Sequence, residues 1–164
     1  MKIYIININK SYDEDGDGYI GGWFNCPVNF EEVKEQLGIR NEDEIEIEDY
    51  ELPFPLTLNM KLWEINALCR IVQDMQGTPL YHEMSRIREK WFGSFEEFID
   101  HKDQIRHYSV QDSETLAKIL LLEESIYGEI SSDLQNHIDY ASFGRELETS
   151  EEYLFTDNGV FRYK

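Results

Sequence analysis

The sequence predicts an α+β fold, and three observations lead to this class. Stretches in which apolar and polar residues alternate lie towards both ends of the chain, whereas the middle carries apolar residues at helical spacing. Near the end, Asn158-Gly159 separates two short apolar runs, which is a strong signal for a tight hairpin. An order of strands, then helices, then helices with a hairpin is typical of α+β chains.

The first third of the chain predicts a small antiparallel sheet with one helix. Residues 2–8 and 19–25 are rich in Ile, Tyr and Trp and predict two strands, joined by a polar Asp/Gly loop at 9–18. Asn29 is followed three residues later by Glu, which predicts the start of a short helix. The stretch 44–48 alternates Glu and Ile strictly, so we expect a strand with one apolar face and one carboxylate face.

The middle of the chain is predicted to be helical. Apolar residues at helical spacing over 58–72 predict a first helix, with Asn59 as its N-cap. A second helix is predicted over 79–90, because Pro suits the first helical position. Ser94 with Glu97 forms a capping box that predicts a third helix.

The last third predicts a short strand, three capped helices and the closing hairpin. In order, these are a strand at 108–110, helices capped by Asp112 or Ser113, by Ser131 or Ser132 and by Asp139, and strands at 152–157 and 160–163.

These elements group into three small modules, divided near Leu58 and Ile105. Residues 1–58 form an α+β module, residues 59–105 a helical module, and residues 106–164 a second α+β module. No internal repeat links the three.

Acidic residues far outnumber basic ones, and they are unevenly placed. Fifteen Lys and Arg stand against 34 Asp and Glu, for a net charge of −19. Residues 31–51 hold ten acids and two bases, a net −8, and residues 119–157 hold ten acids and one base, a net −9. This charge excludes two functions, binding to nucleic acid through a basic surface and binding to an anionic membrane, because both require clustered cations.

The chain shows no sign of export or of a membrane span. No apolar run approaches the roughly 18 residues that a spanning helix requires, and the first residues lack the features of a signal peptide. We therefore expect a cytoplasmic protein in which Cys26 and Cys69 are reduced thiols.

One local pattern matches a metal site. Residues 13–20 place Asp at positions 1, 3 and 5 and Gly at position 6 of an EF-hand calcium loop. Position 12 is Phe24 instead of the bidentate Glu, and the flanks predict strands, so an acidic hairpin loop is the other interpretation. No zinc spacing, nucleotide-binding glycine loop or nucleophile elbow is present, and we predict no catalytic, cofactor-binding or metal residues.

The acidic blocks place carboxylates in rows. Alternate residues on a strand lie about 6.5–7 Å apart, and helix residues three or four apart lie about 5–6 Å apart at Cβ. Like-charged rows cost stability, so they indicate either a solvated face or a surface that attracts a cationic partner. The acids that we expect to form such a surface are Glu31, Glu32, Glu35, Glu42, Asp43, Glu44, Glu46, Glu48, Glu123, Glu124, Glu129, Asp133, Glu146, Glu148, Glu151 and Glu152.

The C-terminal third also resembles a known family. The pattern of ArdA-type antirestriction proteins is similar to four segments of this sequence: Leu120-Leu121-Leu122-Glu123-Glu124-Ser125-Ile126-Tyr127-Gly128-Glu129-Ile130, Asp133-Leu134, His137-Ile138-Asp139-Tyr140 and Phe143-Gly144-Arg145-Glu146-Leu147. His137 and Glu146 are mild departures, standing where Tyr and Asp are usual. The first strand, Gly22-Trp23 and the segment 47–50 are similar as well.

The resemblance implies an elongated, three-part α+β homodimer that mimics bent DNA in the DNA-binding groove of type I restriction–modification enzymes. It implies carriage on mobile genetic elements, no catalysis and no cofactor. The apolar part of the motif then suggests subunit contact through Leu122, Ile126, Tyr127, Ile138, Tyr140 and Phe143. An acidic interaction module for another cationic protein is the alternative function.

Overall fold

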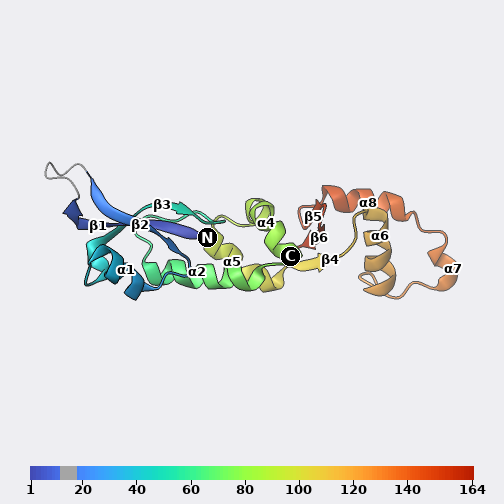
Figure 1. Ribbon diagram of the computed structural model, residues 1–164. Helices are drawn as coiled ribbons and strands as arrows, with labels where there is room; N and C mark the ends of the chain where they lie inside the picture. The colour runs from blue at the N-terminus through green and yellow to red at the C-terminus, as the bar shows by residue number, and fades with distance from the viewer. Residues whose placement is uncertain (12–17) are drawn as a thin grey trace. The chain divides into compact units, whose positions relative to one another are not determined.

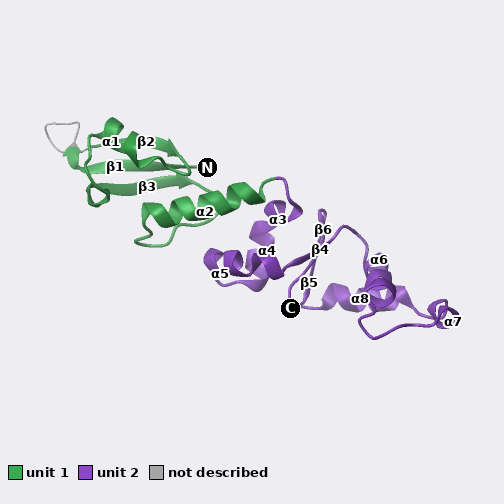
Figure 2. Cartoon of the chain, turned by 90° about the horizontal axis from the view of Figure 1, so that it is seen from below, with its two compact units in different colours: residues 1–76 green, residues 77–164 purple. Residues whose placement is uncertain are grey.

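The computed structural model describes residues 1–11 and 18–164 and forms two compact units, residues 1–76 and 77–164 (Figure 2). Each unit combines a three-stranded antiparallel sheet with helices, which confirms the predicted α+β class. The first helix of the predicted middle module lies in the first unit and the later ones lie in the second. The division into three modules stays a prediction.

The first unit is a sheet with two longer helices on one side (Figure 1). Its strand order is β2-β1-β3, and the central strand buries Ile3 and Ile5 completely. Its elements are β1 (Lys2–Ser11), β2 (Tyr19–Asn25), α1 (Phe30–Leu37), the 3₁₀ helix η1 (Glu42–Glu44), β3 (Ile45–Glu51) and α2 (Leu62–Met75).

Two buried asparagines fasten the helices of this unit to the rest of it. The amide of Asn7 on β1 donates to the carbonyl of Leu37 at 2.9 Å, at the end of α1. Asn66 on α2 accepts from the N–H of Val28 at 2.6 Å and donates to the C=O of the same residue at 2.9 Å. Because both backbone groups of Val28 are satisfied by one side chain, the segment after β2 can be buried against α2.

The predicted start of α2 is wrong. Asn59 is not the N-cap, because its φ of 66° is left-handed, and the helix begins after Lys61 instead. Glu64 closes that end by accepting from the N–H of Lys61 at 2.7 Å. Leu58, expected in the apolar stripe of the helix, therefore lies outside it and is 96% exposed.

The second unit contains short helices and a sheet of order β4-β6-β5. The predicted hairpin is confirmed, but its turn lies one residue earlier than predicted. Thr156 pairs with Gly159, so the two turn residues are Asp157 and Asn158, and Gly159 begins β6. The elements are α3 (Pro79–His82), α4 (Met84–Trp91), α5 (Phe95–His101), the 3₁₀ helix η2 (Lys102–Gln104), β4 (Arg106–Tyr108), α6 (Ser113–Lys118), the π-helical turn η3 (Ile119–Glu123), α7 (Ser132–Gln135), α8 (Tyr140–Thr149), β5 (Tyr153–Thr156) and β6 (Gly159–Arg162).

The helix predicted over 79–90 is divided at Glu83 into α3 and α4. Glu83 has ψ near 7° and is only 6% exposed. Its carboxylate accepts from Asn158 Nδ2 at 2.6 Å and from Arg86 Nη1 at 3.2 Å. The break therefore turns a charged side chain inward, where the hairpin loop and an arginine satisfy it.

The family-like segment builds the core of this unit around α6 and α8. Leu116 and Leu120 are fully buried there with Val160 of the hairpin. Gly144 on α8 is buried against the first residues of α6: an ideal Cβ at this position would lie 2.7 Å from the backbone C and O of Ser113. The two helices therefore approach as closely as they do because residue 144 has no side chain.

Asp112 caps α6 and makes the stability of this unit sensitive to acid. Its carboxylate accepts from the backbone N–H of Thr115 at 2.7 Å, which lowers the pKa of Asp112. Because the folded-state pKa is the lower one, the stabilisation is present above the unfolded pKa. It is lost as the pH falls below about 4 and passes through the folded value.

We therefore expect D112N, whose amide oxygen can still cap, to flatten the acid side of a plot of unfolding midpoint against pH. D100N is the control for the change in net charge, because it removes an exposed carboxylate at the end of α5 that caps no helix start. Urea midpoints at closely spaced pH values would measure this, and parallel curves for D112N and the parent would refute it.

No helix in the described ranges, 1–11 and 18–164, is both long enough and apolar enough to cross a bilayer.

Candidate functional site

The predicted acids of residues 31–48 lie on three successive elements of the first unit. Glu31, Glu32 and Glu35 project from α1, whose opposite face buries Val33 and Leu37. The others lie on η1 and β3: Glu42, Asp43, Glu44, Glu46 and Glu48. All of these acids are exposed except Glu44, which is half-buried. On α1 the carboxylates point outward because the apolar residues of the opposite face are buried.

The predicted acids of residues 123–152 follow the helices of the second unit. Glu123 ends η3 and Glu124 follows it, Glu129 lies in the next loop, and Asp133 lies on α7. The others belong to α8 and the turn before β5: Glu146, Glu148, Glu151 and Glu152. Only Glu152 is half-buried, and the rest are exposed.

Most of these carboxylates form no ion pair with the residues that the structure describes. Four of the sixteen form ion pairs, at N–O distances between 2.7 and 3.9 Å: Glu31 with Lys34, Glu124 with Arg106, Glu151 with Lys90, and Glu152 with Arg162 and Lys164. Within the described residues, the other twelve have no ion pair. Their charge is therefore available to a partner.

The negative charge is shared almost equally between the units. Residues 1–76 hold 16 acids and six bases, a net −10, and residues 77–164 hold 18 acids and nine bases, a net −9. Each unit thus carries an acidic surface of its own.

The apolar residues of the family-like motif serve two purposes. Ile126, Tyr140 and Phe143 pack against the core of their own unit. Tyr127, in contrast, is 77% exposed and touches Phe143 edge-on at 6.2 Å between ring centroids.

Three further apolar residues of this region differ in their exposure. Leu122 and Ile138 are half-buried, whereas Leu134 on α7 is 59% exposed and was not among the predicted contact residues. Its polar neighbours in the sequence, Asp133 and Gln135, were the available signal. Tyr127 and Leu134 are the large exposed hydrophobic residues of this unit.

Groups suited to chemistry or to metal binding are few. The predicted calcium-like loop at 13–17 lies outside the described residues. Among those that are described, no three His, Cys, Asp or Glu side chains converge as metal ligands. Cys26 and Cys69 are buried free thiols; the hydrogen bond from Cys69 lowers the pKa of Cys26, and the same bond together with burial raises that of Cys69.

Comparison with known proteins identifies the family. A search of curated proteins finds no match. Over residues 3–162, nearly its whole length and both units, the sequence matches the family model described as "Antirestriction protein (ArdA)". The chain therefore belongs to the ArdA antirestriction protein family.

Proposed function

We propose that this antirestriction protein is a DNA mimic that occupies the DNA-binding groove of a type I restriction–modification enzyme and acts as a homodimer. The observation that carries the proposal is the set of twelve exposed or half-buried carboxylates, distributed over both units, that have no ion pair among the described residues. A surface of this kind suits a groove built to bind phosphates.

The arrangement of the acids supports the proposal physically. On β3, Glu46 and Glu48 follow the roughly 6.5–7 Å repeat of alternate strand residues, and on α1 Glu32 and Glu35 are one turn apart. Both repeats are near the spacing of neighbouring phosphates. The net charge of −19 corresponds to about 32 Å of duplex at one charge per roughly 1.7 Å of axis.

Competition with DNA tests the proposal against its alternative, an acidic module that binds some other cationic surface. We expect duplex DNA carrying the enzyme's recognition site to displace the protein from a type I enzyme, and the affinity to fall steeply with salt. Simultaneous binding of DNA and protein to one enzyme would contradict the mimic and favour the alternative.

Neutralising several acids of one surface should weaken inhibition, whereas neutralising one should change it little. We expect E31Q/E32Q/E35Q/D43N to reduce inhibition at least tenfold, since each carboxylate contributes a small share of a long-range field. The measurement is the half-inhibitory concentration against a panel of type I enzymes at fixed salt.

The matched control is D74N/E89Q/D100N/D103N, which removes four exposed acids outside both acidic blocks. It changes the net charge equally but should weaken inhibition much less. Equal losses in the two variants would show that total charge, and not its placement, decides inhibition. Loss of all inhibition from one substitution would indicate a specific site instead.

A further inference from the structure

The outer edge of β3 is open to another strand. β3 pairs only with β1, and in the described part of the chain no backbone hydrogen bond joins its other edge to a neighbouring segment. An edge strand with unpaired N–H and C=O groups is a template for a further strand. Charged side chains commonly protect such edges, and the Glu46 and Glu48 carboxylates on β3 mean that an added strand must supply complementary cations.

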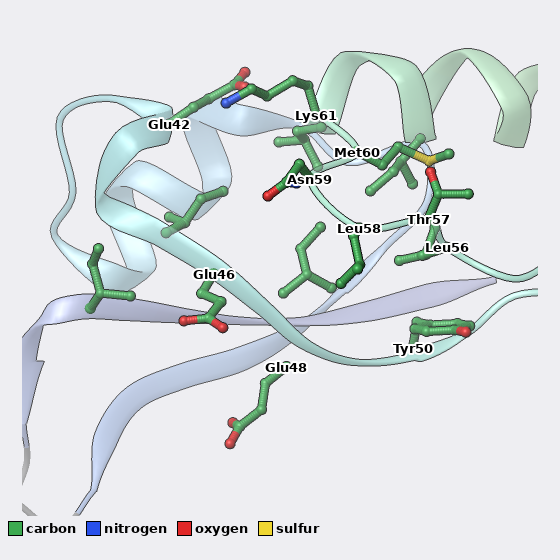
Figure 3. Close-up of a pocket in the computed structure, with 15 residues that line it drawn as sticks. Glu42, Glu46, Glu48, Tyr50, Leu56, Thr57, Leu58, Asn59, Met60 and Lys61 are labelled. Carbon is green, nitrogen blue, oxygen red and sulfur yellow. The ribbon is translucent and has the colours of Figure 1, made fainter.

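A groove of about 530 Å³ lies beside this edge, between β3 and the segment 56–61 (Figure 3). Ile45 and Ile47 of β3 line it together with Ile65 of α2, which gives it an apolar floor. Leu58 lines it from the opposite side and is almost entirely exposed. An apolar side chain of a partner could therefore be buried here against several others.

The charged residues of the groove are mostly acidic and unpaired. Glu42, Glu46 and Glu48 line it, and within the described residues none of the three forms an ion pair. Lys61 is the cation among the lining residues. In Figure 3 the side chains of Glu46 and Glu48 leave β3 on the side away from Leu58, so apolar and acidic contacts lie on opposite faces of the strand.

We infer that this groove binds an extended protein segment in which apolar and cationic residues alternate, added to β3 as a fourth strand. In such a segment alternate side chains point to opposite faces. One set would enter the groove beside Ile45, Ile47 and Leu58, and the other would lie opposite the carboxylates of Glu46 and Glu48.

The same charges exclude other occupants. A second copy of β3 would place Glu46 and Glu48 beside like charges, which disfavours pairing. Duplex DNA is itself anionic and offers neither a strand edge nor an apolar side chain. Binding in this groove is therefore distinct from DNA mimicry, because it depends on backbone and apolar groups that DNA does not offer.

A bulge limits the length of the paired segment. Tyr4 pairs with Asp49 and Ile5 with Ile47, so Glu48 has no partner on β1. The regular part of the open edge is thus Ile45–Ile47. We expect two or three residues of the partner to form the ladder, with the next side chain over Tyr50.

A designed peptide tests this inference directly with the intact protein. The probe is a ten-residue peptide that alternates arginine and valine, compared with a peptide of equal composition whose arginines and valines form two blocks. We expect the alternating peptide to bind at least tenfold more tightly and to slow amide hydrogen exchange within residues 45–47. Equal affinities, or amide changes confined to α1, would overturn the inference.

Variants separate the groove from general acidity. L58A should weaken binding of the alternating peptide about tenfold, whereas W63A, which truncates a 65% exposed residue of α2 outside the groove lining, should not. E46Q/E48Q should weaken it more than D74N/E89Q does at the same net charge. Equal effects within either pair would refute the inference, and none of these results depends on inhibition of a restriction enzyme.

Discussion

Replacing Gly144 by alanine is expected to destabilise the second unit by about 3 kcal/mol, the upper range for overpacking a buried site. The added Cβ would meet the backbone C and O of Ser113 at 2.7 Å and the N of Glu114 at 3.0 Å. Backbone atoms at a helix start cannot rotate away as a side chain can, so α6 and α8 must move apart.

The expected loss of stability is opposite to the usual result, because replacing glycine by alanine inside a helix ordinarily stabilises a protein by about 1 kcal/mol. Urea unfolding with amide exchange on α8 as the readout would measure it for the second unit alone. G93A is the matched control: the nearest atom to its Cβ is a carboxylate oxygen of Glu97 at 3.4 Å, on a flexible side chain. A midpoint for G144A at or above that of the parent would contradict the packing.

Replacing Asn66 by leucine should destabilise the first unit by about 2–6 kcal/mol, because it leaves two buried backbone groups unsatisfied at roughly 1–3 kcal/mol each. Both are on Val28: its N–H loses the bond of 2.6 Å and its C=O the bond of 2.9 Å. Leucine has nearly the same size, so loss of packing contributes little.

N25L is the control, since Asn25 is exposed on β2 and its replacement should change the unfolding midpoint little. Amide exchange gives a second readout: in N66L the N–H of Val28 should lose its protection even under conditions where the unit remains folded. If the Val28 amide stayed protected and the midpoint were unchanged, Asn66 would have no structural role.

Elements defined by local signals could be predicted from the sequence. Strict alternation of Glu and Ile gave β3, and Asn158-Gly159 gave the hairpin. Two caps were also evident, because Ser94 accepts from the N–H of Glu97 and Asp139 from that of Ser142. Signals of this kind need only neighbours in the sequence.

Features that depend on distant partners could not be predicted. The break between α3 and α4 exists because Glu83 bonds Asn158, 75 residues away. The late start of α2 follows from the left-handed backbone of Asn59, which leaves Leu58 beside β3 instead of in a helical core. Periodicity alone includes Leu58 in the helix, because it cannot register a backbone reversal.

The same distinction applies to the acidic surface. Exposure of the carboxylates could be expected, since burying a charge without a partner is costly. Which of them are neutralised depends on the fold: Glu124 is paired because the chain returns Arg106 to it across 18 residues. Sequence spacing would not distinguish Glu124 from its neighbour Glu123, which forms no ion pair with any residue that the structure describes.

The strand order β4-β6-β5 has a consequence for synthesis on the ribosome. The central strand of this sheet is β6, which comes later in the chain than β4 and β5, the two strands it pairs with. In the first unit the central strand is β1, which comes before both of its partners. The first unit can therefore assemble around a strand already made. In the second unit, β4 and β5 cannot pair into the sheet until β6 has left the ribosome. The sheet of the unit that contains the family-like motif therefore forms last.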